Sequence, residues 1–158
     1  MEPHIGIKSE YSEEVANALI GMLADEFILY VQTRKAHWNV ESPHFFFLHK
    51  LFEDQYRRIG ELIDDVAERI RSIGYFAPAT LREYLQLTHL TEQSHRTGYD
   101  NGFLRDLLMT HESIIMNLRK HIDSVDQKLR DAGTSDFITG VVMTHEKMAW
   151  ILRSHLID

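Results

Sequence analysis

Residues 35–74 read KAHWNVESPHFFFLHKLFEDQYRRIGELIDDVAERIRSIG, and this stretch decides the fold of the chain. It predicts one long helix over residues 43–73, with Ser42 able to cap the start, Pro43 suited to the first turn and Gly74 able to end it. An apolar stripe repeats along this helix at three- and four-residue steps, which is typical of a face packed in a helical bundle. The stripe consists of Phe45, Leu48, Phe52, Ile59, Ile63, Val66 and Ile70.

Beside the apolar stripe runs a second stripe that is polar at both ends. His49 and Glu53 lie at one end and Asp64 at the other, with Glu68 one turn later, and His37 lies near the end of the preceding segment. At about 1.5 Å of rise per residue, His49 and Asp64 are roughly 22 Å apart, so no single metal ion can contact both. A second, antiparallel copy of the helix would bring its own acidic pair to these histidines. Such a two-fold contact is self-complementary and forms the site twice.

Gly60 lies midway along this polar stripe. A glycine inside a helix costs about 1 kcal/mol relative to alanine. We expect it to be tolerated here because another backbone comes close near a two-fold axis.

The predicted metal ligands are His37, His49, Glu53, Asp64 and Glu68. Imidazoles and carboxylates without thiolates suit iron, manganese or zinc, and such a site could oxidise ferrous iron. Each residue also has an alternative interpretation. A single histidine near a helix end is often a capping or surface residue, Glu53 could act through a water molecule or be merely exposed, and the other two acids could belong to a solvated face paired with neighbouring arginines.

The remainder of the chain predicts three more long helices. They span about residues 12–38, 100–130 and 134–156, and Ser12 caps the first of them. A crossover over residues 75–99 holds a short helix that begins with Thr80 as its cap. Ala132 and Gly133 stop the third long helix, and Thr134 or Ser135 caps the last. These elements predict an all-α, ferritin-like four-helix bundle with a short helix in the long middle crossover.

Composition limits the class of protein. With 158 residues, 44% of them hydrophobic and 26% charged, the chain predicts a single domain over residues 1–158 with a short tail at about 1–11. The absence of cysteine excludes disulfides and thiolate metal sites, which fits a cytoplasmic protein. We find no secretory signal and no apolar run long enough to span a membrane. The net charge of −7 should repel nucleic acid.

Other candidate residues favour plain interpretations. Two E-x-x-H spacings, Glu41 with His44 and Glu92 with His95, lie at a helix start and in the irregular crossover, and we interpret both as accidental. Neighbouring residues on a helix point in different directions and do not chelate together easily, which applies to the pairs His111–Glu112 and His145–Glu146.

The tryptophans and one group of acids also have two interpretations each. Trp38 is expected to pack at an interface, or to be an oxidisable ring beside a redox metal, and Trp150 is expected in the core. Asp123, Asp126 and Asp131 could line a pore for ions in an oligomer, although solvated helix surface is the simpler interpretation.

Three segments together resemble the Dps family, the DNA-binding proteins from starved cells. They are KAHWNV from Lys35, PHFFFLH ending at His49 and DDVAERI from Asp64, and the resemblance covers about residues 18–156. It implies a hollow homo-dodecamer with iron sites between two-fold-related subunits. His37 and His49 would come from one subunit, and the acids matching Asp64 and Glu68 from the other. The position of Glu53 is also acidic in relatives, often as aspartate.

The resemblance further implies oxidation of Fe²⁺, preferably by hydrogen peroxide, and storage of the ferric mineral inside the cage as protection against oxidative damage. Each site could hold two iron ions, and other divalent metals could substitute. The alternative functions are a DNA-compacting nucleoid protein with secondary iron binding and a helical interaction module without metal chemistry. The chain has no lysine-rich tail, and twelve copies carry 12 × −7 = −84 formal charges. We therefore expect no tight DNA binding.

Overall fold

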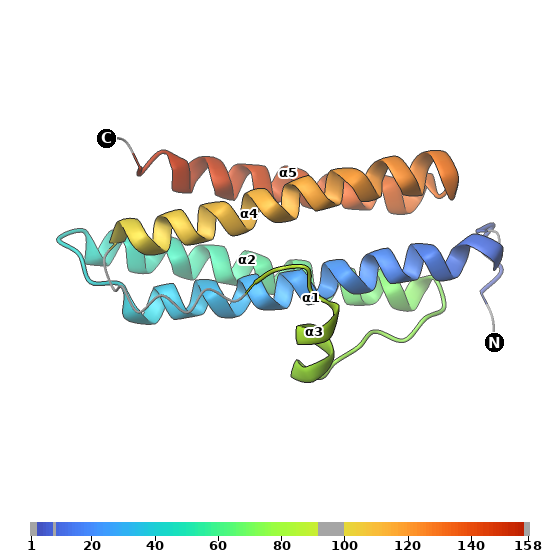
Figure 1. The fold of residues 1–158 in the computed structure, drawn as a ribbon, viewed down its shortest axis with the longest axis horizontal. Helices are drawn as coiled ribbons and strands as arrows, with labels where there is room; N and C mark the ends of the chain where they lie inside the picture. Colours follow the sequence, from blue (N-terminus) through green and yellow to red (C-terminus); the bar gives the residue numbers. More distant parts are fainter. Residues whose placement is uncertain (1–2, 8, 92–99, 157–158) are drawn as a thin grey trace.

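The computed structural model describes residues 3–7, 9–91 and 100–156. Over these residues the chain forms four long helices and one short one: α1 (Ser9–Asn39), α2 (Phe45–Ser72), α3 (Leu81–Leu87), α4 (Asp100–Asp123) and α5 (Ala132–Arg153), with a π-helical turn at Ser124–Lys128. This confirms the predicted all-α bundle with a short helix in the crossover. α1 packs along α2 and α4 along α5, and the two helix pairs stack on each other, with α3 beside α1 (Figure 1).

The start of α2 differs from the prediction. The helix begins at Phe45, and His44 is the N-cap residue but forms no side-chain cap bond to the described residues. Ser42 closes the turn before the helix instead: its hydroxyl accepts a hydrogen bond from the His44 N–H at 3.0 Å, and its carbonyl accepts one from the Phe45 N–H at 3.0 Å. Pro43 therefore lies in this turn and not in the first turn of the helix.

The end of α2 agrees with the prediction. Gly74 has a φ of +100°, a conformation that favours glycine. Its N–H donates to the Arg71 carbonyl at 3.0 Å, and the Tyr75 N–H donates to the Ile70 carbonyl at 3.2 Å. These two bonds form a Schellman motif, which satisfies carbonyls at the helix end.

The capping residues of the other helices were predicted with mixed success. Thr80 caps α3 in a complete capping box with Glu83, as expected. Ser12 lies inside α1, which starts at Ser9, and its hydroxyl bonds to the Tyr75 hydroxyl at 2.9 Å. The cap of α5 is Asp131, whose carboxylate accepts from the Thr134 N–H at 3.0 Å.

The predicted third helix also ends differently. Its α-helical part stops at Asp123, and the π-helical turn continues it to Lys128, with the Leu129 N–H bonded to the Ser124 carbonyl at 3.2 Å. Arg130 then turns the chain with a φ of +54°. Ala132 and Gly133 do not stop this helix, because they already belong to the first turn of α5.

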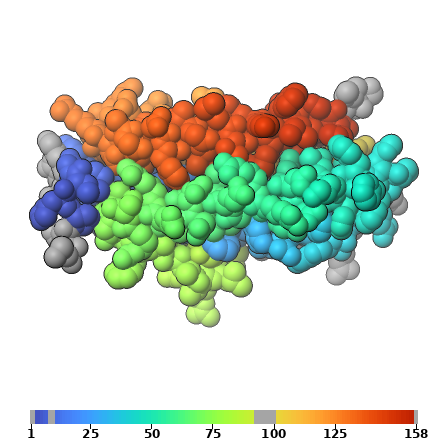
Figure 2. All heavy atoms as spheres, turned by 180° about the vertical axis from the view of Figure 1, so that it is seen from behind, coloured from blue at the N-terminus to red at the C-terminus, as the bar shows by residue number. Residues whose placement is uncertain are grey.

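The core lies between the two helix pairs. Most of the apolar residues predicted for the α2 stripe are buried, with Phe52 and Ile59 fully so. Phe45 is an exception, since it lies at the helix start and is exposed. Trp150, which we expected in the core, is 61% exposed on α5, so that prediction was wrong. Seen from behind, α2 and α5 lie side by side across one face, with a shallow groove of about 700 Å³ between them (Figure 2).

Candidate metal site

The turn over residues 40–44 brings the two predicted histidine ligands together. His37 lies in the last turn of α1 and His49 near the start of α2. Their rings stack with centroids 3.8 Å apart and planes inclined by 24°. Both residues are half-buried, so they are held by packing and still partly accessible.

Each of these histidines is held by the backbone of the other. The His37 Nδ1 lies 2.8 Å from the His49 carbonyl oxygen, and the His49 Nδ1 lies 2.8 Å from the His37 carbonyl oxygen. Because a carbonyl oxygen can only accept, each Nδ1 must carry the proton and donate it. In the neutral ring each Nε2 is then left with a free lone pair. This tautomer is the one in which an imidazole binds a metal through Nε2, with its other nitrogen oriented by a hydrogen bond.

Glu53 lies one turn beyond His49 on the same side of α2. Its carboxylate accepts a hydrogen bond from Lys50 Nζ at 3.1 Å and another from Arg57. The bond from Lys50 lowers the pKa of Glu53 below its ordinary value, and the charges of Arg57 and Lys50 lower it further. The side chain is therefore an anion near the histidine pair, as a metal ligand requires.

Asp64 and Glu68 lie far along α2 from the histidines, and both are exposed. The arginines that could have paired with them contact other groups. Arg69 donates to the Thr134 hydroxyl at 2.8 Å and lies 3.6 Å from Asp131. Arg71 donates to the Tyr75 carbonyl and lies over the Phe76 ring. These contacts weaken the interpretation of the two acids as one half of a surface salt-bridge network.

One chain does not complete a metal site. Across residues 3–7, 9–91 and 100–156, no three His, Asp or Glu side chains are grouped closely enough to hold a metal ion. The predicted ligands therefore form two separate groups on one subunit, histidines with Glu53 at one end of α2 and two acids near the other. Their union across a two-fold contact stays a prediction.

Gly60, between these two groups, has ordinary surroundings within the subunit. A Cβ atom added there would meet one ring atom of Tyr30 at 3.7 Å, which is normal van der Waals contact. The predicted close approach of a second backbone concerns another copy of the chain, and it too stays a prediction.

Aromatic rings of α1 and α2 gather around Arg34 beside the histidine pair. The Arg34 guanidinium lies 5.0 Å from the centroid of Trp38, 4.7 Å from that of Tyr56 and 5.5 Å from that of Tyr30. Tyr56 also meets His37 edge-on, with centroids 5.3 Å apart. Trp38 itself is 63% exposed in the single subunit, and its packing at an interface stays a prediction.

The other candidates from the sequence lie apart from the histidine pair or outside the described residues. Glu41 and His44 are exposed in the loop before α2. Glu92 and His95 lie outside the described residues. Asp131 is buried against Thr134 and Arg69, which removes it from any pore lining, whereas Asp123 and Asp126 are both exposed.

Within each of the adjacent pairs, His111–Glu112 on α4 and His145–Glu146 on α5, the two side chains point in different directions, as expected. Glu112 and Glu146 face outward and bind Arg153 and Arg119. His111 and His145 face inward, are fully buried and contact each other. The sequence analysis missed this contact, although both histidines continue the apolar core positions of their helices at three- and four-residue steps.

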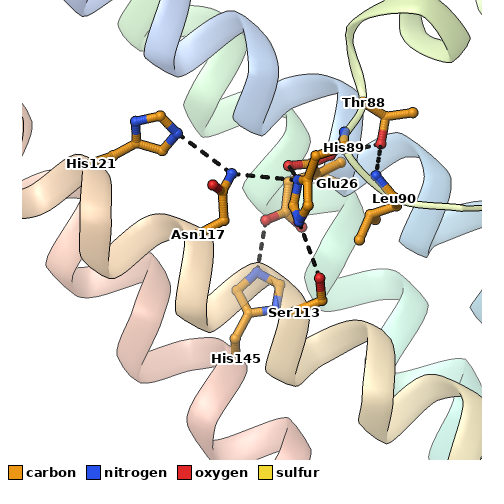
Figure 3. A network of polar contacts seen from close by, with 9 residues as sticks. Glu26, Thr88, His89, Leu90, Ser113, Asn117, His121 and His145 are labelled. Carbon is orange, nitrogen blue, oxygen red and sulfur yellow. Dashed lines mark hydrogen bonds and ion pairs between the residues drawn. The ribbon is translucent and has the colours of Figure 1, made fainter.

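Two adjacent, buried acids of α1 bind histidines, one at the surface and one in the core, which the sequence analysis also missed. Asp25 accepts hydrogen bonds from the Thr88 hydroxyl at 2.6 Å and from His89 Nδ1 at 2.7 Å, and Glu26 accepts one from His145 Nε2 at 2.7 Å. Burial raises the pKa of Asp25 despite these bonds. His89 also forms a hydrogen bond with the Ser113 hydroxyl on α4. The Asn117 side chain lies between His89 and His121 and contacts both (Figure 3).

Among the described residues, no helix is both long enough and apolar enough to cross a lipid bilayer.

Comparison with known proteins agrees with this fold and with the resemblance noted above. The ferritin-like domain family matches residues 16–158. The chain is 39% identical over 133 residues to an uncharacterized low-temperature-induced protein of Nostoc sp., covering 84% of this chain and 74% of that protein. It is 32% identical over 125 residues to DNA protection during starvation protein 2 of Bacillus anthracis, covering 79% and 84%.

A solved structure shows the same similarity in three dimensions. The Dps protein of Vibrio cholerae O1, described as a member of a broad superfamily of ferritin-like diiron-carboxylate proteins, matches with a TM-score of 0.91 and 27% identity. The match covers 99% of this chain and 97% of that one.

Proposed function

Because this chain belongs to the ferritin-like proteins of the Dps family, we propose that it stores iron and protects against oxidative damage by oxidising Fe²⁺ at sites shared between two subunits. Family membership supports iron storage and protection in general. The peroxide reaction, the shared site and the dodecamer are the finer parts of the proposal.

The observation that carries the proposal is the reciprocal hydrogen bonding of His37 and His49. It fixes the tautomer of both rings and leaves an Nε2 lone pair on each of two stacked, half-buried rings. Glu53 adds a negative charge nearby. The acids Asp64 and Glu68 would come from the two-fold partner, so that each pair of subunits forms two sites.

Ferrous iron is the substrate of this reaction and hydrogen peroxide the preferred oxidant. Two Fe²⁺ ions give one electron each, the O–O bond of peroxide is cleaved, and two protons are taken up, so that two Fe³⁺ ions and two water molecules form. The electrons arrive as a pair from two metals, and no hydroxyl radical is released. The protein contributes mainly by holding both ions and the oxidant together. The ferric product would be stored as mineral inside a hollow homo-dodecamer located in the cytoplasm.

The test is the rate at which metal-free protein oxidises Fe²⁺ with hydrogen peroxide, followed by the absorbance of the ferric product. We expect His37→Ala and Asp64→Ala each to abolish the fast phase while the assembled mass is unchanged. Asp65→Ala is the matched control for the acid, because Asp65 is also exposed and lies next to Asp64. An unchanged rate in the first two variants, or an equal loss in the control, would refute the assignment of the site.

A further inference from the structure

Three fully buried ionisable side chains connect the two helix pairs at the centre of the bundle. Glu26 belongs to α1, His111 to α4 and His145 to α5, and all three are inaccessible to solvent. The Glu26 carboxylate lies 2.7 Å from His145 Nε2, and His145 Nδ1 lies 2.9 Å from His111 Nδ1. Figure 3 shows the His145 side chain of α5 reaching Glu26 of α1. Within the described part of the chain, these contacts link α1 of one helix pair to α4 and α5 of the other.

The contact between the two histidines requires a single proton. Two Nδ1 atoms at 2.9 Å form a hydrogen bond only if one of them carries hydrogen and the other accepts it. A second proton either places two N–H groups against each other or occupies His111 Nε2, which is buried with no acceptor in the described part of the chain. Both positions are unfavourable. His145 cannot avoid this by turning over, because its Nε2 already donates to Glu26.

The arrangement suits a proton better than a metal ion. Glu26 Oε2 and His111 Nε2 are buried without a hydrogen-bond partner in the described part of the chain, and they lie at opposite ends of the series of contacts. No set of three ligands surrounds a common point within the same residues.

We propose that Glu26, His145 and His111 form a proton-controlled clasp between the two helix pairs, closed by one proton between the histidines and opened by a second. When the clasp opens, the α4–α5 pair separates from α1. Burial lowers the pKa of His111 well below its ordinary value, and the charge of His145 lowers it further. The folded chain therefore resists the second proton, which the opened chain accepts.

The direction of the pH effect follows from this difference. The opened form takes up a proton on His111 near the ordinary histidine pKa of about 6.5, whereas the closed form does so only at much lower pH. The closed form is therefore fully favoured above about pH 6.5 and loses stability as the pH falls. Between pH 7.5 and 5.5 the ratio (1 + 10)/(1 + 0.1) gives about a tenfold rise in the opening constant, equivalent to about 1.4 kcal/mol.

Other titratable groups lie near the clasp and must be separated from it. Asp25, His89 and His121 belong to the neighbouring network on α1, the crossover and α4. Burial lowers the pKa of His121 and raises that of Asp25, so these two groups change stability in opposite directions on acidification. The buried polar side chain of α2 is Gln55, which does not titrate.

The experiment measures urea unfolding and amide-exchange protection of the full chain at pH 7.5 and 5.5, at one protein concentration. His111→Gln keeps a hydrogen-bonding side chain that cannot take up a proton, and it should lose the tenfold factor. His121→Gln should retain that factor, and His44→Gln is the control for an exposed histidine. In the wild type, protection should fall first in α4 and α5. If His111→Gln keeps the full pH dependence, the proposal is overturned.

A second measurement on the wild type covers the case in which His111→Gln does not fold. Nitrogen NMR of the histidine rings reports which nitrogen carries a proton. We expect His111 and His145 to share one proton at pH 7.5 and to gain the second only together with the loss of protection. Independent titration of either ring in the fully protected fold would also overturn the proposal.

Discussion

Two variants that are each inactive should regain activity when they are mixed within one oligomer. His37→Ala removes an imidazole ligand, and Asp64→Ala removes a carboxylate ligand from the far part of α2. The 15 residues from His49 to Asp64 within that helix span roughly 22 Å, whereas metal–ligand bonds are only about 2.0–2.2 Å long. A subunit therefore cannot combine its own two groups of ligands in one site.

The amount of recovered activity follows from counting subunits. In a shared site the histidines come from one subunit and the acids from its two-fold partner. A site is intact when its histidine donor is the Asp64→Ala subunit and its acid donor is the His37→Ala subunit. In a random equal mixture each condition holds for half of the subunits, so about one quarter of the sites should be intact.

The assay compares co-assembled oligomers, purified with a different tag on each variant, with oligomers of either variant alone. The rate of Fe²⁺ oxidation by hydrogen peroxide should reach about a quarter of the wild-type rate. A mixture of His37→Ala with His49→Ala is the matched control, because both changes affect the same half of the site and no combination restores it. Activity no higher than that of the two parents would refute a shared site.

Four more tests concern helix capping, core packing, the Glu53 carboxylate and surface charge. Thr80→Ala removes the capping box of α3 and should lower the free energy of unfolding by about 1 kcal/mol, measured with urea; no change would show that α3 is held by packing alone. Phe52→Ala removes a fully buried ring and should cost about 3–5 kcal/mol in the same assay, so a loss below 1 kcal/mol would contradict the described core. Glu53→Gln should weaken apparent Fe²⁺ affinity about 10- to 100-fold, with Asp54→Asn as the control, if the carboxylate acts at the histidine pair. Mobility shift at low salt should reveal no stoichiometric DNA complex, because the chain carries a net charge of −7.

The long helices could be predicted because each carries a continuous apolar repeat. That repeat fixed the number of helices, the face of α2 that is buried and the place of the crossover. Helix ends were harder to predict, since several residues near each end can cap. Ser12, Ser42 and Thr134 all have suitable side chains, yet each makes its hydrogen bonds in another role. Tertiary contacts decided between them.

The candidate ligands at the histidine end of α2 could be predicted because they are close together in the sequence. His37, His49 and Glu53 come from one short stretch, so a single turn places them together. The tautomer of the two histidines was not predictable, because it depends on two carbonyl oxygens that face the rings only after α1 and α2 have packed. The orientation that prepares these rings for metal binding is thus a property of the helix pair and not of the motif alone.

The contacts of the buried histidines could not be predicted from the sequence. Helical periodicity places His111 and His145 in the core, but sequence does not say which side chains face them from other helices. Their contact with each other and with Glu26 depends on how far α4, α5 and α1 are shifted along their axes. A shift of one turn moves each partner by about 5.4 Å, which is enough to break both hydrogen bonds. The same contacts therefore set the register between the helix pairs, so Glu26→Gln, which keeps the hydrogen bond but removes the charge, should change stability without changing that register.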